Sequence, residues 1–390
     1  MRILIVLTYY RPHTSGLTIY AERLAKALVR RGHQVTVLTS HFIKDLLFEE
    51  VQDGVKIIRV PVLFRLSKGT IMPAFGFKAN QLVLEHDVIQ LHLPQLDAAG
   101  VALRGRLLKK PTVITYHCDL KMPPGLLSWA ANQAVNLMNH LAAQFTHRIV
   151  TYTEDYAVNS PYLKNYLGKL KVIPPPVELP EKTEKMVKAF AAKNNPAKRK
   201  PVIGLAARFA SEKGVEVLLA ALPKILEAFP NAMVQFAGPF KNILGEEWYF
   251  NRLSPQINQY IEQGAWNFTG ELNPDEMAGF YPNLDVLVLP SLNSTEAFGL
   301  VQIEAMMNGV PCVASDLPGV RQPVKLHKMG KIIPIGDSNA LAESVIEILR
   351  SPERFRSDAE TITKAYFPET IAREYEDLFN QLLNELGSTH

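Results

Sequence analysis

The sequence predicts two Rossmann-like α/β domains in tandem, each a doubly wound, mostly parallel sheet covered by helices. Short apolar runs rich in β-branched residues recur between longer amphipathic stretches, as is typical of parallel α/β architecture. This pattern stops in a polar segment near the middle of the chain and then restarts. In addition, 390 residues exceed the roughly 250–300 that one hydrophobic core accommodates.

The first half of the chain contains six predicted strands, at residues 3–7, 35–39, 55–60, 88–91, 112–116 and 148–152. Between the first two of them, Leu24 and Leu28 follow the spacing of a helix. That helix is expected to stop at Gly32, because glycine adopts the left-handed conformation that ends helices. The order strand, helix, strand indicates a parallel sheet.

The segment 178–201 is rich in Lys, Pro and Asn and includes the run AKRKP, so we interpret it as a linker. After it, four further strands are predicted at residues 202–206, 233–237, 286–289 and 312–315. The chain ends in an amphipathic helix at 371–386 with no strand after it. This helix either closes the second domain or returns to the first.

Composition favours a cytoplasmic globular protein, with 47% hydrophobic and 21% charged residues. No uninterrupted apolar stretch approaches the roughly 18 residues of a membrane span. The apolar run at 3–7 is also too short for the core of a signal peptide, so it is interpreted as a buried strand. Cys118 and Cys312 form neither a disulfide framework nor a metal cluster, which suits a reducing compartment.

Charge is unevenly distributed along the chain. Residues 1–190 carry 24 Lys and Arg against 14 Asp and Glu, whereas the remainder carries 18 against 24. A basic first half suggests an anionic partner other than nucleic acid, although ordinary solvated surface charge gives the same count. The mixed apolar and basic segment 61–84, with Arg65, Lys68 and Lys78, could contact anionic lipid or a lipid-linked acceptor.

A predicted helix at 126–145 could add to such a surface. Its apolar residues would face lipid, whereas its polar residues carry almost no positive charge. The alternative is that this helix belongs to the protein core. Its polar side chains are Asn132, Gln133, Asn139 and His140.

The most informative segment is PSLNSTEAFGLVQIEAMMNGVPCVAS, residues 290–315. A buried strand ends in a polar loop that carries Glu296, and a helix starts near Gly299, which permits close backbone approach. The N–H groups of Leu300 and Val301 would point out of the helix start, where phosphate binds. Glu304, further along the helix, is placed to accept hydrogen bonds from ribose hydroxyls, and Glu296 lies where a sugar would follow the phosphates.

Two glutamates with Phe-Gly-Leu between them closely resemble the signature of glycosyltransferase family 4, whose members have the GT-B fold and retain anomeric configuration. The segments RPHTSG, TYHCDL, ARFASEKG and AYFPETIAREYEDLF resemble further family motifs, so the resemblance covers almost the whole chain. It implies an acceptor-binding domain at 1–190 and a nucleotide-sugar-binding domain at 191–366, facing each other across a cleft. The C-terminal helix, at about 367–390, is expected to cross back to the first domain.

The resemblance also implies roles for individual residues. Arg208 and Lys213 would grip the diphosphate, and Gly16 would allow close approach, with Ser15 in place of the family's usual first glycine. Each of these residue types alone is more often structural or merely solvated. The remaining implied roles are catalysis by His117 and Glu296 through contact with the transferred sugar, sugar contact by Phe298, and a base region around Gly238, Gly270 and Leu272.

The expected activity is transfer of a hexosyl group from a UDP or GDP sugar, the co-substrate, to a hydroxyl acceptor that is a glycan, a lipid-linked sugar or a small glycoside. We expect front-face substitution with no bound cofactor and no metal, since no Asp-x-Asp motif is present and fixed cations can replace a divalent ion. Two other functions are compatible with the same architecture: a nucleotide-sugar epimerase and a non-catalytic sugar-nucleotide-binding protein.

Overall fold

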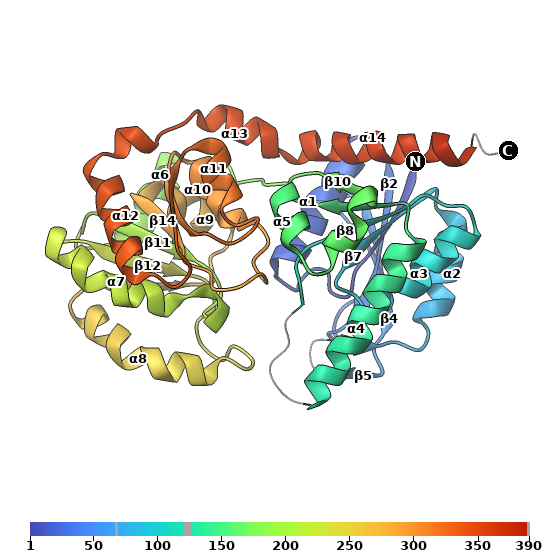
Figure 1. Ribbon diagram of the computed structural model, residues 1–390, viewed down its shortest axis with the longest axis horizontal. Coiled ribbons are helices and arrows are strands. Elements are labelled where there is room, and N and C mark those ends of the chain that lie inside the picture. The colour runs from blue at the N-terminus through green and yellow to red at the C-terminus, as the bar shows by residue number, and fades with distance from the viewer. Residues whose placement is uncertain (67–68, 121–125, 388–390) are drawn as a thin grey trace. The chain divides into compact units, whose positions relative to one another are not determined.

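The computed structural model describes residues 1–66, 69–120 and 126–387 (Figure 1). The chain divides into two compact units, Met1–Val177 with Ala365–His390, and Glu178–Lys364. Each unit contains its own sheet with parallel pairing, so the predicted α/β class is confirmed.

The first unit is built on an eight-stranded sheet in the order β10-β9-β8-β7-β1-β2-β4-β3, parallel except for β3 against β4. The central strand β1 is buried from Ile3 to Val6, because helices cover both faces. A separate hairpin joins β5 and β6. The strands are β1 (Arg2–Val6), β2 (Gln34–His41), β3 (Glu49–Gln52), β4 (Val55–Pro61), β5 (Phe64–Leu66), β6 (Gly69–Ile71), β7 (Val88–Leu93), β8 (Thr112–Tyr116), β9 (Arg148–Thr151) and β10 (Leu170–Val172).

The C-terminal helix belongs to this first unit, as the resemblance implied. α14 packs on α1, where Tyr375 and Phe379 are fully buried and Arg31 pairs with Glu376. The tail therefore completes the N-terminal domain. The helices of this unit are α1 (Gly16–Arg30), α2 (Phe75–Glu85), α3 (Ala98–Leu107), α4 (Leu126–Phe145), α5 (Glu154–Asn159) and α14 (Pro368–Gly387), and α13 (Ala359–Tyr366) leads into α14.

The second unit has a six-stranded parallel sheet in the order β13-β12-β11-β14-β15-β16. The strand order reverses between β11 and β14, and ligands of doubly wound sheets bind at the carboxyl ends of the strands at such a point. The strands are β11 (Val202–Ala206), β12 (Met233–Ala237), β13 (Trp266–Gly270), β14 (Val286–Leu289), β15 (Cys312–Ser315) and β16 (Gly330–Ile333). The helices are α6 (Glu184–Asn194), α7 (Val215–Ala228), α8 (Glu247–Glu262), α9 (Pro274–Phe280), α10 (Leu300–Met306), α11 (Gln322–His327) and α12 (Ser338–Arg350).

The interpretation of 178–201 as a linker is wrong for its middle part, which forms α6. The Thr183 hydroxyl accepts the N–H of Met186 and caps this helix. Phe190 is buried with its ring edge against Phe280 of α9, so α6 is part of the second unit's core. The basic and proline-rich residues on both sides of α6 made the whole segment resemble a linker, so the short amphipathic helix within it was not predicted.

The polar residues of α4 do not all form a solvated face. Asn139 is buried, and its side-chain oxygen accepts the backbone N–H of Gln95. Trp129 and Leu137, by contrast, are exposed. One side of α4 therefore packs in the protein core, and another side exposes apolar side chains at the surface. Among the residues that the structure describes, no helix is both long and apolar enough to cross a membrane.

Candidate active site

Two loops meet at the carboxyl ends of β11 and β14, where the strand order of the second unit reverses. The β11 loop carries Lys213 and the β14 loop carries Glu296. Lys213 Nζ donates to Glu296 Oε2 at 2.6 Å, and each side chain is 18% exposed. The structure thus brings together a predicted diphosphate-binding cation and a predicted sugar-binding carboxylate at the place that the topology favours for a ligand.

Close backbone packing holds these two loops in register. Gly214 has φ +66°, and a Cβ built there would lie 2.0 Å from the carbonyl oxygen of Pro290. The backbone N–H of Leu292 also donates to the carbonyl oxygen of Glu212 at 2.9 Å. Glycine is required at 214 both for its left-handed conformation and for this contact.

Arg208 is paired with Glu212, four residues along the same loop. The carboxylate of Glu246 accepts the backbone N–H of Ser211 at 2.9 Å and steadies the turn between them. Sequence reasoning missed Glu212, although it lies inside ARFASEKG at the spacing that suits an ion pair with Arg208. Both predicted cations thus have carboxylate partners within the unit.

Gly299 precedes α10 with φ +81°, and a Cβ there would lie 2.3 Å from a methyl carbon of Leu289. Leu300 and Val301 occupy the first turn of this seven-residue helix, and N–H groups in a first turn have no intrahelical acceptor. These two backbone donors lie at the end of the loop that carries Glu296.

The two other predicted sugar contacts near α10 are buried. Glu304 accepts the hydroxyl hydrogen of Tyr281 at 2.6 Å, so one of its oxygens already has a protein donor. Tyr281 is a second residue that sequence reasoning missed, because it lies 23 positions away. Phe298 is 2% exposed, and its carbonyl oxygen accepts from Gln302, so its ring is part of the core.

The segments predicted to surround the base follow β12 and β13. The N–H of Gly238 donates to the carbonyl oxygen of Gly270 at 2.8 Å and joins the two loops. Leu272 is partly exposed beyond β13. The rings of Phe240 and Phe268 stack in parallel with centroids 4.1 Å apart beside these glycines.

His117 lies in the first unit, directly after β8, and is 6% exposed. Its Nε2 shares a hydrogen bond of 2.7 Å with Nδ1 of His92, and its Nδ1 is bonded to the hydroxyl of Tyr152. Burial, and then the neighbouring His92, hold the pKa of His117 well below its usual value. Burial lowers the pKa of His92 to about 3. Both rings are neutral near pH 7, so His117 cannot supply positive charge, and a ligand that hydrogen-bonds its ring must replace either His92 or Tyr152.

Gly16 is the first residue of α1, directly after the loop that follows β1. A Cβ at Gly16 would meet no other atom of the described chain within 4 Å, so internal packing does not require glycine here. Ser15 caps α1 by accepting the N–H of Thr18. The serine that replaces the family's first glycine therefore has a structural task.

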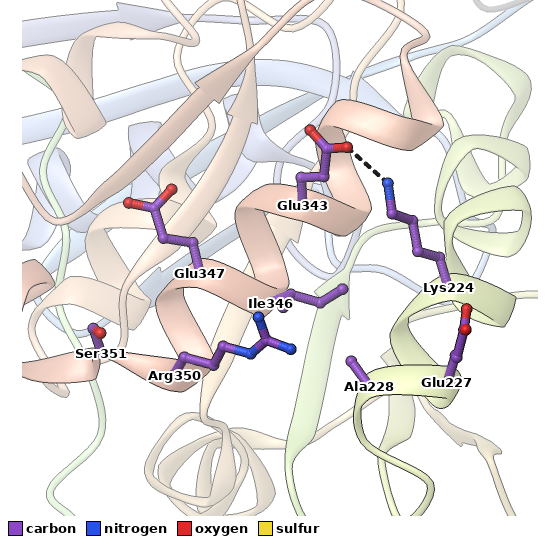
Figure 2. Close-up of a pocket in the computed structure, with 8 residues that line it drawn as sticks. All are labelled: Lys224, Glu227, Ala228, Glu343, Ile346, Glu347, Arg350 and Ser351. Atoms are coloured by element: carbon purple, nitrogen blue, oxygen red, sulfur yellow. Dashed lines mark hydrogen bonds and ion pairs between the residues drawn. The ribbon is translucent and has the colours of Figure 1, made fainter.

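A groove of about 650 Å³ lies between α7 and α12 in the second unit (Figure 2). Lys224 and Glu343 pair across it at 2.7 Å. It lies along the C-terminal halves of helices that follow the strands, hence away from the carboxyl-end loops that hold Lys213 and Glu296. The groove therefore does not coincide with the candidate site.

Comparisons with known proteins cover both units. Residues 187–365 match the family of glycosyl transferases group 1, and residues 14–180 match glycosyltransferase family 4. A phosphatidyl-myo-inositol mannosyltransferase of Mycobacterium leprae is 25% identical over 90% of this chain and 88% of its own. A glycogen synthase of Mycobacterium tuberculosis is 25% identical over 95% and 92%.

Among solved structures, Anabaena Alr3699/HepE in complex with UDP has a TM-score of 0.77 at 20% identity, over 98% of this chain and 100% of that one. This likeness establishes the GT-B fold. The fold and the matched regions together define a nucleotide-sugar-dependent glycosyltransferase. The chain belongs to glycosyltransferase family 4, in the hexosyltransferase class.

Proposed function

We propose that this protein transfers a hexosyl group, with retention of anomeric configuration, from a UDP or GDP sugar to a hydroxyl acceptor. The observation that carries the proposal is the Lys213–Glu296 pair at the switch point of the second sheet. It joins a cation suited to a diphosphate to a carboxylate suited to sugar hydroxyls. The phosphatidylinositol mannosyltransferase and the UDP-bound structure support a nucleotide-sugar donor of this kind.

In this proposal Arg208 and Lys213 neutralise the diphosphate as it departs, with Leu300 and Val301 N–H groups adding fixed dipoles. Their positive charge makes a metal unnecessary. Glu296 binds sugar hydroxyls once the diphosphate takes over Lys213. The other assigned contacts are the ribose with Glu304, the sugar with neutral His117, the diphosphate with Gly16 and Gly299, and the base with the segments at Gly238, Gly270 and Leu272.

The proposed reaction is a front-face substitution. The bond between the anomeric carbon and the diphosphate oxygen breaks, and the acceptor oxygen bonds to that carbon from the same side. The acceptor proton passes to an oxygen of the departing diphosphate. A covalent route would need a carboxylate about 5 Å from the acid/base on the opposite face of the sugar. Glu296 is assigned to hydroxyl contacts, not to that position.

A panel of UDP-glucose, GDP-mannose and ADP-glucose tests this function. We expect slow hydrolysis of one donor without acceptor, with release of the nucleoside diphosphate and an α-configured sugar. Lys213→Ala should abolish that release. An epimerised donor would establish the epimerase instead, and tight binding without turnover of any donor would establish a binding protein.

We further propose that the acceptor is lipid-linked and that the protein works peripherally on the cytoplasmic face of an anionic membrane. The relative from Mycobacterium leprae is named for a phosphatidylinositol acceptor. In the segment 61–84 of the first unit, Leu63 and Phe64 near its start and Phe77 within α2 are exposed, with Phe77 81% exposed. Arg65 and Lys78 follow Phe64 and Phe77 in the sequence, and their side chains contact the carbonyl oxygen of Phe42 and the carboxylate of Glu49. Lys68 lies outside the described residues.

Sedimentation with vesicles of anionic phospholipid tests this surface. Binding at low salt is expected, and Phe64→Ser with Phe77→Ser should weaken it. Leu244→Ser is the matched control, since Leu244 is 77% exposed in the second unit. Equal binding of the control and the double variant would show that the exposed residues of 63–77 do not contact lipid.

A further inference from the structure

The hydroxyl of Tyr375 joins the C-terminal helix to two other elements of the first unit. Tyr375 is fully buried on α14, and its hydroxyl shares hydrogen bonds with the hydroxyls of Tyr20 on α1 at 2.7 Å and of Thr115 on β8 at 2.8 Å. Gln90 of β7 donates to Thr115 Oγ1 at 3.0 Å. The Thr115 hydroxyl is therefore free to donate onward to Tyr375. Three elements distant in sequence, α14, α1 and β8, thus meet at one buried phenol, and β7 joins them through Thr115.

This cluster adjoins His117. Thr115 is two residues before His117 along the same strand direction, so both point to the same side of the sheet. The ring of Tyr20 meets the ring of His117 edge-on, with centroids 5.1 Å apart and planes at 88°. Tyr20 also stacks on Tyr152, whose hydroxyl binds His117 Nδ1, with centroids 5.5 Å apart. The ring of Tyr20 therefore packs against both His117 and its hydrogen-bond partner Tyr152.

We propose that Tyr375 is a positioning residue for His117. Its hydroxyl is hydrogen-bonded to the hydroxyls of both Tyr20 and Thr115. These bonds fix the Tyr20 ring, which packs against His117, and the end of β8, from which His117 extends, so together they orient the imidazole. The inference rests on the proposed function, in which neutral His117 contacts the transferred sugar. A hydrogen bond to a sugar is directional, so a tilted imidazole loses turnover without losing the nucleotide, whose assigned contacts other than Gly16 lie in the second unit.

The test compares Tyr375→Phe with Phe379→Leu in the full-length protein. Phe379 is fully buried on the same helix, with its ring centroid 5.8 Å from that of Tyr375, but it has no hydrogen bond to lose. Tyr375→Phe should lower kcat for hydrolysis of the accepted nucleotide sugar by about ten-fold. UDP or GDP affinity, measured by calorimetry, should stay within two-fold of the wild type in both variants, and Phe379→Leu should keep its kcat.

A spectroscopic readout separates this inference from the proposed function. Nitrogen-15 NMR of the His117 ring, assigned with His117→Gln, should shift in Tyr375→Phe but not in Phe379→Leu, whether or not any donor is turned over. Tyr20→Phe removes the same hydrogen bond from the other side and should reproduce the shift. If Tyr375→Phe does not fold, the Tyr20→Phe variant provides the same test. An unchanged His117 resonance in the folded Tyr variants, or equal kcat losses in Tyr375→Phe and Phe379→Leu, would overturn the inference.

Discussion

Substitution of Gly214 by alanine should inactivate the enzyme without removing any side chain that contacts substrate. The added Cβ would lie 2.0 Å from the carbonyl oxygen of Pro290, whereas such contacts are essentially never shorter than 3.0 Å. The β11 and β14 loops must then move apart by about 1 Å, since packed backbone relieves overlap by shifting. Lys213 and Glu296, which lie on those two loops, would separate with them.

The expected loss follows from that displacement. A misplacement of about 1 Å at a reacting centre costs on the order of 100-fold in rate. The left-handed conformation adds about 1–2 kcal/mol of strain for alanine, but that part lowers stability and leaves the reaction of the folded enzyme unchanged. Gly214→Ala should therefore lower kcat/KM for donor hydrolysis about 100-fold and reduce Tm.

Substitutions at two other glycines of the second unit separate the effect of loop displacement on the rate from the effect of backbone strain on stability. Gly264 has a similar φ of +71°, yet a Cβ there would make only ordinary contacts of 3.7 Å with Arg199. Gly330→Ala would overlap the carbonyl oxygen of Cys312 at 1.8 Å, at the amino ends of β15 and β16. Gly264→Ala should lose a little stability, and Gly330→Ala more, while each folded variant retains its rate.

Hydrolysis of UDP-glucose or GDP-mannose, whichever the wild type accepts, is measured with circular dichroism melts of all four proteins. The assay temperature is set below the onset of unfolding of the least stable variant. The relative position of the β11 and β14 loops does not determine activity if Gly214→Ala retains the rate of Gly264→Ala. The same conclusion follows if Gly330→Ala loses as much rate as Gly214→Ala.

Three further outcomes are expected. Glu296→Gln and Lys213→Ala should each abolish transfer with an unchanged circular dichroism spectrum, and near-normal rates in both would refute their assignment. Activity should survive EDTA, whereas complete loss restored by magnesium would contradict the proposed metal independence. Stability should also fall on acidification: below pH 6.5 the unfolded chain binds protons that buried His92 and His117 do not, down to the folded-state pKa of about 3 for His92. The free energy of unfolding should therefore drop by about 1.4 kcal/mol per pH unit for each histidine. Urea titrations at several pH values should show that this free energy depends less steeply on pH in His117→Gln than in the wild type. An identical pH dependence in the two proteins would count against neutral burial of His117.

The alternation of apolar and amphipathic segments was sufficient to predict the inner strands of both main sheets, because buried parallel strands need continuous apolar residues. The four strands at the edges of these sheets were not predicted: β3, β10, β13 and β16. They are short, and polar residues interrupt or replace their apolar ones, because an edge strand is buried less completely. Helix α6 was missed for a similar reason, since a single buried aromatic, Phe190, fixes it.

At the site, strand-end residues could be predicted, whereas their partners could not. Lys213 and Glu296 each follow a recognisable strand, and the topology brings their loops together. Tyr281, which binds Glu304, and His92, which binds His117, come from other elements and carry no local motif. Such partners become visible only when the register of the sheet is known.

The ion pairs of the second unit also determine which anions can compete for the site. Because Arg208 and Lys213 each hold a carboxylate, the resting loops present little net charge to a solute. An inorganic phosphate that displaced one of these carboxylates would leave a glutamate without its cation, so we expect millimolar phosphate to inhibit only weakly. In the proposed function, a sugar nucleotide replaces both ion pairs, since its pyrophosphate is assigned to the two cations and its hexose to the released Glu296. The proposed site is therefore expected to discriminate against small anions through the two ion pairs of the unliganded chain.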